Sequence, residues 1–226
     1  METVSFSLME LFKLGGIIMW PLLVFSVIVV AISIERAVYL SYHNFKSVDI
    51  FNKVTNLLKS NDHPGAIEYL SSLTKRNMGA RILLTLLKNL KPLNPSQNKN
   101  SDVSYYLQRA EKAAETEASA CINSLENGFN FLTALGSLAP LTGFLGTVTG
   151  MIGAFRAIAE ASEVNAQIVA NGIYEALITT VFGLIIAIIA MLSHSIFSHI
   201  VDRFASRIEG LCSDLIIQIS DPYTNI

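Results

Sequence analysis

Three long stretches without a charged side chain constrain this chain more than any other feature of its sequence. The first runs from Leu14 to Ile34 and holds 21 residues free of Asp, Glu, Lys and Arg. The second covers Asn127 to Phe155, and the third Ala176 to Val201. A helix needs about 20 apolar residues to cross the hydrocarbon core of a bilayer. The sequence therefore predicts an all-α membrane protein with three transmembrane helices.

Composition agrees with lipid as the solvent and removes several classes of function. Charged residues make up 15% of the chain, against about 25% in soluble domains. A net charge of −2 without a basic tract does not favour nucleic acid as a partner. Cys121 and Cys212 have no second thiol or histidine at ligand spacing, and His194 and His199 are five residues apart. We therefore expect no metal and no cofactor, and interpret both cysteines as packing residues.

The distribution of basic residues predicts the orientation of the spans. The segment Glu35 to Glu126 holds 12 of the 16 Lys and Arg residues, whereas the loop between the second and third stretches has only Arg156. Positive charge is retained on the cytoplasmic side of a membrane. The amino terminus is thus expected outside, and the large segment and the carboxyl tail inside. The first stretch is too long for a signal-peptide core and is interpreted as an uncleaved anchor.

The large polar segment carries no catalytic motif. It lacks a phosphate-binding glycine loop, a nucleophile elbow and an H-E-x-x-H sequence. Helical patterns cover Ile50 to Leu58 and Ile82 to Leu90, and the prolines of Lys91 to Ser96 predict a linker.

Two long helices are expected to leave the membrane on the cytoplasmic side. Helix-forming residues from Asp102 onward lead directly into the second span. Beyond the third span, apolar residues at three- and four-residue spacings form a stripe: Val201, Phe204, Ile208, Leu211, Leu215 and Ile219. Each of these spans is therefore predicted to continue as one rod.

The second and third spans are rich in small and hydroxylated residues. Gly136 to Gly153 contains five glycines and three threonines, and Gly146-x-x-x-Gly150 has the spacing of closely packed membrane helices. The third span repeats the pattern with Thr179, Gly183 and Ala187. Residue chemistry alone leaves two interpretations open, which are tight packing and a hydrophilic pore lining.

Glu175 favours the second interpretation. An ionisable group in a span costs roughly 2.5–3.5 kcal/mol near the midplane and usually faces water or a partner. A structural Glu that snorkels or bonds a neighbouring helix is the alternative. The functional hypothesis is a protonatable group near the mouth of a conducting cavity.

Three motifs resemble a known family. Gly-x-x-Met-Trp-Pro-Leu-Leu-x-x-Ser, beginning at Gly16 and followed by Ile34-Glu35-Arg36, resembles the opening of ExbB-type proteins. The blocks LAPLTGFLGTV (138–148) and GIYEALITT (172–180) are similar to the two signatures of the ExbB/TolQ/MotA proton-channel family. The blocks occur in the expected order, each on a predicted span.

The resemblance implies a homopentameric ring in which the second and third spans line a channel. A dimer of single-span, ExbD- or TolR-like partners would sit inside it and carry the proton on a membrane aspartate. The ion pathway implied for this chain consists of Thr147, Thr180 and Glu175. Further pore-lining or helix-packing residues are implied as well: Thr142, Gly143, Gly146, Gly150, Thr179 and Gly183.

The function implied is that of a channel subunit, not an enzyme, in an inner-membrane motor that drives TonB-dependent outer-membrane transport. The entry Met19-Trp20-Pro21 and the exit Glu35-Arg36 favour this ExbB-like role over a TolQ-like role in envelope integrity. A flagellar stator is disfavoured, because those members usually have a fourth span. A non-conducting membrane scaffold is the alternative from another class.

The expected arrangement is a multi-pass protein of the bacterial inner membrane, with the amino terminus periplasmic, the carboxyl terminus cytoplasmic, and membrane lipid around the spans. The predicted segments follow in chain order: a periplasmic or interfacial segment (1–13), the first span (14–40), a cytoplasmic helical segment (41–126), the second span (127–156), a short periplasmic loop (157–167), the third span (168–196), and a cytoplasmic helix and tail (197–226).

Overall fold

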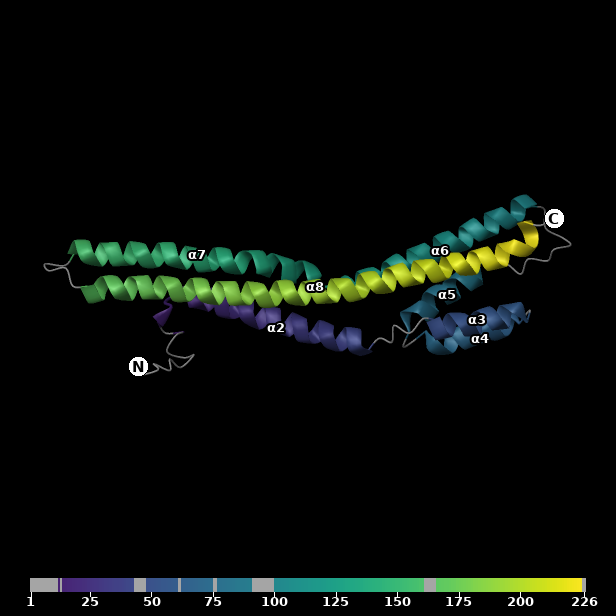
Figure 1. Cartoon of the computed structure of the whole chain (residues 1–226), viewed down its shortest axis with the longest axis horizontal. Helices are drawn as coiled ribbons and strands as arrows, with labels where there is room; N and C mark the ends of the chain where they lie inside the picture. Colours follow the sequence, from purple (N-terminus) through teal and green to yellow (C-terminus); the bar gives the residue numbers. More distant parts are fainter. Residues whose placement is uncertain are drawn as a thin grey trace. The chain divides into compact units, whose positions relative to one another are not determined.

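The structure is a computed structural model, and it describes residues 12, 14–42, 48–60, 62–74, 77–90, 100–160 and 166–224. Regular structure in these residues is helical, without a strand (Figure 1). The helices follow in chain order: α2 (Met19–Tyr42), α3 (Val48–Lys59), α4 (His63–Leu73), α5 (Met78–Asn89), α6 (Asn100–Glu126), α7 (Phe129–Glu160) and α8 (Ala166–Thr224). The all-helical prediction is confirmed.

Three helical stretches are long and apolar enough to cross a membrane. They are Met19–Tyr42, Ser104–Glu160 and Ala170–Ser220, with mean hydropathies of 2.1, 1.5 and 2.5 over their most apolar windows. The chain is thus a multi-pass membrane protein with three candidate spans. Most of the predicted 1–13 segment, the linker within 91–99 and the central residues 161–165 of the predicted short loop lie outside the described residues.

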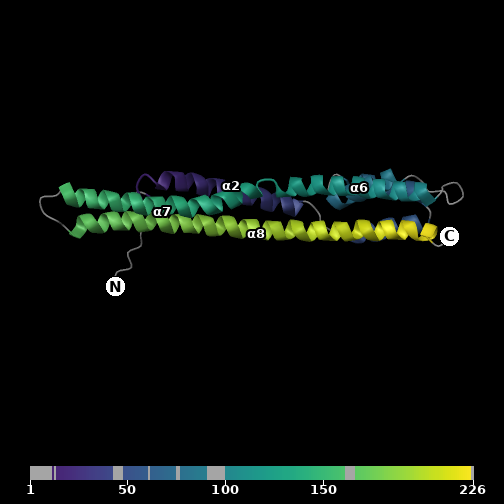
Figure 2. The ribbon, with the colours of Figure 1, turned by 90° about the horizontal axis from the view of Figure 1, so that it is seen from above.

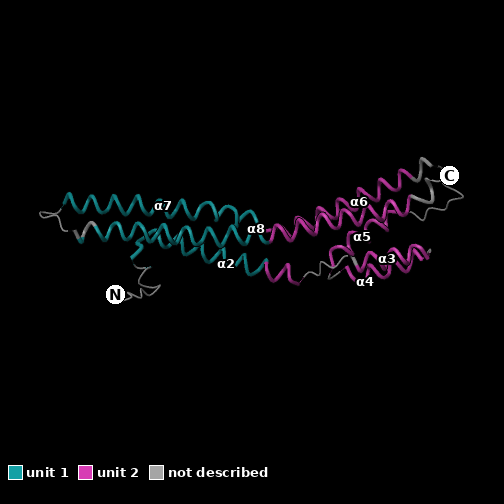
Figure 3. Tube along the Cα trace, in the orientation of Figure 1, with its two compact units in different colours: residues 1–36, 128–196 teal, residues 37–127, 197–226 magenta. Residues whose placement is uncertain are grey.

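The chain divides into two compact units (Figure 3). Unit 1 comprises Met1–Arg36 and Gly128–Ile196, and unit 2 comprises Ala37–Asn127 and Phe197–Ile226. In unit 1, α7 lies beside the first part of α8 in both ribbon views (Figures 1 and 2). Unit 1 therefore contains the two glycine-rich spans together with most of α2.

The helix leading into the second span is interrupted, where the sequence predicts a continuous rod. A two-residue turn at Asn127 and Gly128 separates α6 from α7. Gly128 has φ = 86°, a left-handed conformation that glycine adopts without the steric cost of a side chain. Its carbonyl accepts the N–H groups of Phe131 at 3.1 Å and Leu132 at 3.3 Å, so α7 starts afresh here. By contrast, α8 runs unbroken for 59 residues.

Unit 2 contains three short helices that pack in sequence, together with α6 and the last part of α8. The Asp62 carboxylate accepts the Gly65 N–H at 2.9 Å and the Asn77 side chain accepts the Ala80 N–H at 3.0 Å, which caps α4 and α5. Most of α5 is buried, including Ile82, Leu83 and Leu86. The helices predicted around Ile50–Leu58 and Ile82–Leu90 are present as α3 and α5, whereas α4 has no counterpart in the sequence analysis.

The apolar stripe predicted for the carboxyl tail is present on α8. Val201, Phe204, Ile208 and Leu215 are buried. This stripe gives unit 2 its apolar core on the α8 side.

Candidate functional site

A continuous seam of small residues joins α7 to α8. On α7 the buried positions include Gly136, Ala139, Gly143, Gly146, Gly150 and Ala154. Their contacts on α8 run in the opposite order, from Ala190 opposite Gly136 to Gly172 opposite Ala154. The two helices are therefore antiparallel and approach each other closely along about five turns.

The two helix backbones approach closely around Gly143 and Gly183. A Cβ atom there would lie 2.8 Å from the Thr179 carbonyl oxygen and 3.0 Å from the Thr180 Cα atom. A Cβ on Gly183 would meet the Ala139 carbonyl and lie 3.3 Å from the Gly143 Cα atom. These neighbours are backbone atoms, which cannot rotate away as side chains can. Glycine is required at both positions for the helices to keep their spacing.

Two hydroxyls of α8 lie within hydrogen-bonding distance of one carbonyl across the seam. Thr179 is 1% exposed, and its Oγ1 donates to the carbonyl of Ala176 at 2.8 Å and lies 3.3 Å from that of Gly143. Thr180 Oγ1 donates to the same Gly143 carbonyl at 3.2 Å. A hydroxyl that donates its proton to a carbonyl in apolar surroundings removes the cost of leaving either group unpaired. These bonds fix the rotation of α8 against α7.

The hydroxyls of α7 are satisfied within their own helix. Thr147 Oγ1 donates to the Phe144 carbonyl at 2.6 Å, and Thr142 Oγ1 to the Leu138 carbonyl at 2.9 Å. A hydroxyl has one proton and two lone pairs. Thr147 therefore keeps acceptor capacity on the side away from its helix, as does Thr180.

Thr147 and Thr180 lie on the same side of the seam. Thr147 follows Gly143 by four residues and Thr180 follows Thr179 by one, so each is rotated in the same sense from its seam residue. Because the helices are antiparallel, rotation in the same sense brings both side chains to one side. The Gly143 carbonyl, which accepts from Thr180, is also the helical acceptor for the Thr147 N–H. The two threonines thus form one polar position.

Glu175 lies on the other side. It precedes Thr180 by five residues, which is about 140° around the helix. Its side chain is half-buried and covers Gly16, where a Cβ atom would collide with the Glu175 carboxylate. Gly16 has φ = 65° and belongs to the turn that precedes α2. Within one chain, Glu175 contacts the start of the first span and does not join the two threonines.

Glu35 and Arg36 form an ion pair near the other end of α2. Arg36 is 8% exposed, and its Nε and Nη2 atoms donate to the two carboxylate oxygens of Glu35 at 2.6 and 2.9 Å. A Cβ on Gly128 would lie 3.9 Å from the Arg36 Nε atom. The pair therefore compensates a buried cation beside the start of α7.

Sequence reasoning missed part of the seam and the turn before α2. Gly172, Ala176 and Ala154 extend the seam toward the start of α8, at the same four-residue spacing that marks Gly183. That spacing is a signal visible in the sequence. The contact of Glu175 with Gly16 joins residues far apart in the chain and has no such signal.

No metal centre forms among the described residues, since no three His, Cys, Asp or Glu side chains come together there. His194 packs edge-on against the Phe129 ring, with centroids 5.8 Å apart. This contact accounts for one histidine as a packing residue at the end of the seam.

The fold and the seam define a multi-pass α-helical membrane protein whose two glycine-rich spans pack backbone to backbone. Residues 77–210, more than half of the chain, match the MotA/TolQ/ExbB proton channel family. The chain belongs to this family, as the three motifs predicted, and is therefore a channel-family protein and not an enzyme. The match contains the whole seam and all three proposed ion-pathway residues, whereas the first span precedes it.

Individual proteins with related sequences carry names from the same family. A Synechocystis protein named biopolymer transport protein ExbB-like 3 is 35% identical over 186 residues, which are 81% of each chain. The biopolymer transport protein ExbB of Pseudomonas putida is 29% identical over 113 residues, covering 50% of this chain and 34% of that protein. The Tol-Pal system protein TolQ of Haemophilus influenzae is 45% identical over 74 residues, covering 33% and 32%.

Proposed function

We propose that this protein is the channel subunit of an ion-driven motor in a bacterial inner membrane, and that it powers TonB-dependent transport across the outer membrane. Family membership and the similarity to ExbB and ExbB-like proteins support this role. In the proposal the chain assembles as a homopentamer, its amino terminus faces the periplasm, and its large helical segment lies in the cytoplasm. An ExbD-like dimer occupies the channel and a TonB-like protein receives the work.

One observation carries the proposed ion pathway. The hydroxyl protons of Thr147 and Thr180 are used by backbone carbonyls on one side of the seam. The two hydroxyl oxygens are then left with lone pairs that can accept hydrogen bonds from outside the helix pair. Such acceptors suit a protonated carboxyl, a hydronium ion or a sodium ion, and they do not donate to a bare carboxylate. The polar position therefore offers lone pairs to an arriving ion or to a partner aspartate that has taken one up.

In the proposed mechanism, the charge of the partner aspartate decides which surroundings it prefers. A neutral aspartate on the partner helix can pass an apolar wall, whereas a charged one needs water or a polar partner. Each uptake of an ion changes the preferred position of the partner, and repeated uptake turns it stepwise within the ring. A charge crossing the membrane releases about 2.3 kcal/mol per 100 mV, so useful work requires several ions.

Glu175 acts at a different point in the proposal. Its contact with the turn before α2 favours a place at the periplasmic mouth, about two and a half turns from the start of α8. There it would attract cations before they reach Thr147 and Thr180. The two threonines and the carboxylate can therefore be tested separately.

The test is ion flux in liposomes that contain the chain copurified with its single-span partner. An imposed membrane potential drives flux in sodium-free and in sodium-containing buffers, which also identifies the ion. Thr147→Val with Thr180→Val should abolish flux at any external ion concentration. Glu175→Ala should abolish ion-driven activity at ordinary concentrations, and high external ion concentration should restore part of it.

A matched control shares the chemistry but not the position. Thr149 lies on α7 and bonds the Leu145 carbonyl at 3.0 Å, on the side of the seam away from Thr147. Thr149→Val should keep both assembly and flux. Normal flux in the Thr147→Val/Thr180→Val variant, with assembly intact, would refute the pathway and favour a non-conducting scaffold.

A TolQ-like role in envelope integrity is the second candidate. The 45% identity over 74 residues to the Haemophilus influenzae TolQ supports it. Complementation separates the two roles, since an ExbB-like subunit should restore outer-membrane uptake and a TolQ-like subunit should restore detergent resistance.

A further inference from the structure

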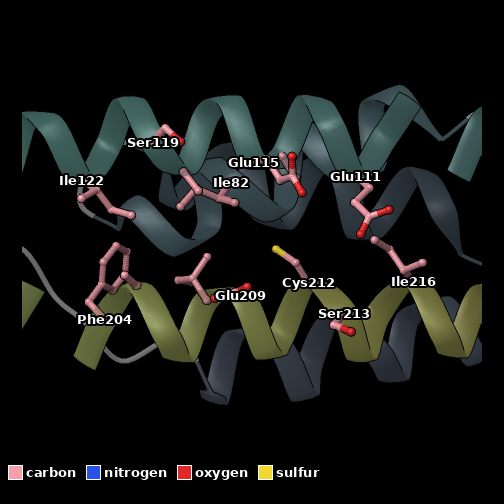
Figure 4. A pocket seen from close by; sticks show the side chains of 14 residues that line it. Ile82, Glu111, Glu115, Ser119, Ile122, Phe204, Glu209, Cys212, Ser213 and Ile216 are labelled. Carbon is pink, nitrogen blue, oxygen red and sulfur yellow. The ribbon is translucent and has the colours of Figure 1, made fainter. Parts of the chain in front are cut away.

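Unit 2 contains an open groove between α6 and the last part of α8. Its volume is about 450 Å³, and Figure 4 shows side chains of the two helices facing each other across it. Ile122 of α6 and Ile216 of α8 contribute half-buried apolar side chains to its lining, together with the buried side chains of Ile82, Phe204 and Ile208. Ligand grooves have volumes of about 300–1,000 Å³, so this one is large enough for several apolar side chains.

The groove stays open because the residues between its walls are small. The lining includes four small residues, Ala114 and Ala118 of α6 and Ala205 and Ser213 of α8. Side chains of this size cannot reach across the space between two helices. The small residues on both helices therefore help to keep the groove open.

Negative charge surrounds the groove. Glu111 and Glu115 come from α6 and Glu209 from α8, and no Lys or Arg contributes to the lining. Lys112 pairs with Glu115 at 3.1 Å. Among the described residues, Glu111 and Glu209 make no ion pair, and both are exposed. An apolar floor with two uncompensated carboxylates favours a ligand that is both apolar and cationic.

We propose that this groove binds a basic amphipathic helix, namely the cytoplasmic juxtamembrane segment of a membrane-protein partner. Apolar side chains at positions i, i+3 or i+4 and i+7 of such a helix would fill the groove. Its Lys or Arg side chains would reach Glu111 and Glu209. Membrane proteins concentrate Lys and Arg on the cytoplasmic side of their spans. The assignment of the partner rests on the proposed function, which puts unit 2 in the cytoplasm.

Peptide binding to the full-length protein tests the proposal. The protein is held in nanodiscs of zwitterionic lipid, and the probe is a fluorescein-labelled 18-residue Leu/Lys peptide of helical period, followed by anisotropy. The same peptide with Glu in place of Lys, and empty nanodiscs, are the controls. We expect saturable binding of the Lys peptide only, and weaker binding at high salt.

Variants locate the site. Glu111→Gln with Glu209→Gln should weaken binding about three- to tenfold, in line with the small free energies of exposed charge pairs. Glu68→Gln with Asp214→Asn removes the same charge from exposed positions outside the groove and should leave binding unchanged. Ala118→Leu fills the groove and should weaken binding at low and high salt alike, with helical content by circular dichroism showing that the fold persists.

Three results would overturn the proposal. They are equal binding by wild type and both groove variants, equal binding of the Glu peptide, and a change of oligomer size by light scattering in Ala118→Leu without peptide binding to wild type. The last would assign the groove to a second copy of this chain. Because binding is measured without ion flux, a failure here leaves the proposed channel function standing. Conversely, loss of that function would leave the binding result intact.

Discussion

Replacing Gly143 by alanine perturbs the seam where the two backbones lie close together. The new Cβ atom would lie 2.8 Å from the Thr179 carbonyl oxygen, whereas ordinary contact begins at 3.4 Å. The helices must therefore part by about 0.6 Å at this level, because the obstructing atoms are backbone. The hydroxyls of Thr179 and Thr180 lie 3.3 and 3.2 Å from the Gly143 carbonyl and would move beyond hydrogen-bonding distance.

The expected change in the free energy of unfolding combines two costs and one gain. Inserting a methyl group into a closely packed site costs about 1–3 kcal/mol, and hydrogen bonds between membrane helices contribute about 0.6 kcal/mol each. Alanine recovers up to about 1 kcal/mol through its higher helix propensity. We expect Gly143→Ala to lower the free energy of unfolding by about 1–3 kcal/mol.

Gly153 provides the matched control on the same helix. A Cβ atom there meets nothing within 4 Å, so Gly153→Ala keeps only the gain in helix propensity. We expect it to be neutral or more stable by up to about 1 kcal/mol. The assay is unfolding in mixed micelles with increasing sodium dodecyl sulfate, followed by circular dichroism, with the two transition midpoints compared against wild type.

Equal midpoints for Gly143→Ala and Gly153→Ala would refute the close approach of α7 and α8. A Gly183→Ala variant provides an independent check, because its Cβ would meet the Ala139 carbonyl from the opposite helix. It should be destabilised to a similar extent as Gly143→Ala.

Two further predictions concern other parts of the chain. Gly16→Ala should lower the free energy of unfolding by about 1–2 kcal/mol because residue 16 has a left-handed backbone. A double-mutant cycle with Glu175→Ala should show coupling of at least about 0.5 kcal/mol. Strict additivity would contradict the contact between Gly16 and Glu175. Burial raises the pKa of the Cys212 thiol to about 11, and since the thiolate is the reactive form, its maleimide labelling in a Cys121→Ala background should rise about tenfold per pH unit from pH 7 to 10. The exposed control Gly210→Cys, with Cys212 replaced by alanine, should approach its maximal rate about two pH units earlier; identical pH profiles would contradict the burial of Cys212.

Long-range patterns in the sequence were sufficient to predict much of the fold. Charge-free length predicted the three candidate spans, and the three- and four-residue spacing around Phe204 and Ile208 predicted the buried stripe of α8. Both signals are averages over many residues, so a single exception does not remove them. The helix α4 was not predicted because it is only 11 residues long and shows little periodicity. It depends more on its N-cap, Asp62, and on Pro64 in its first turn.

The predicted continuous helix from Asp102 into the second span is interrupted in the structure, and the reason is the local conformation of one residue. The sequence before the second span is rich in helix formers, which predicts continuity from Asp102 onward. Gly128 alone ends it, through a positive φ that places it beside Ile32 and Arg36 of α2. A single glycine within a helical pattern costs only about 1 kcal/mol, so its use as a turn is decided by tertiary neighbours that the sequence does not reveal.

The proposed ion pathway also combines positions that follow from helical geometry with one that depends on a tertiary contact. Thr147 and Thr180 can be assigned to one side of the seam from helical geometry alone, once Gly143 and Thr179 are known to face each other. Glu175 cannot, because its position depends on the turn at Gly16, more than 150 residues earlier in the chain. A carboxylate over that turn and hydroxyls on the opposite side divide the proposed pathway into a mouth and an inner position. An ion must then pass from one side of the seam to the other, and a single subunit offers no route through backbone contacts this close. The crossing therefore has to occur around the seam, between neighbouring subunits or along the partner helix, which is the physical reason for a ring to be part of the proposed function.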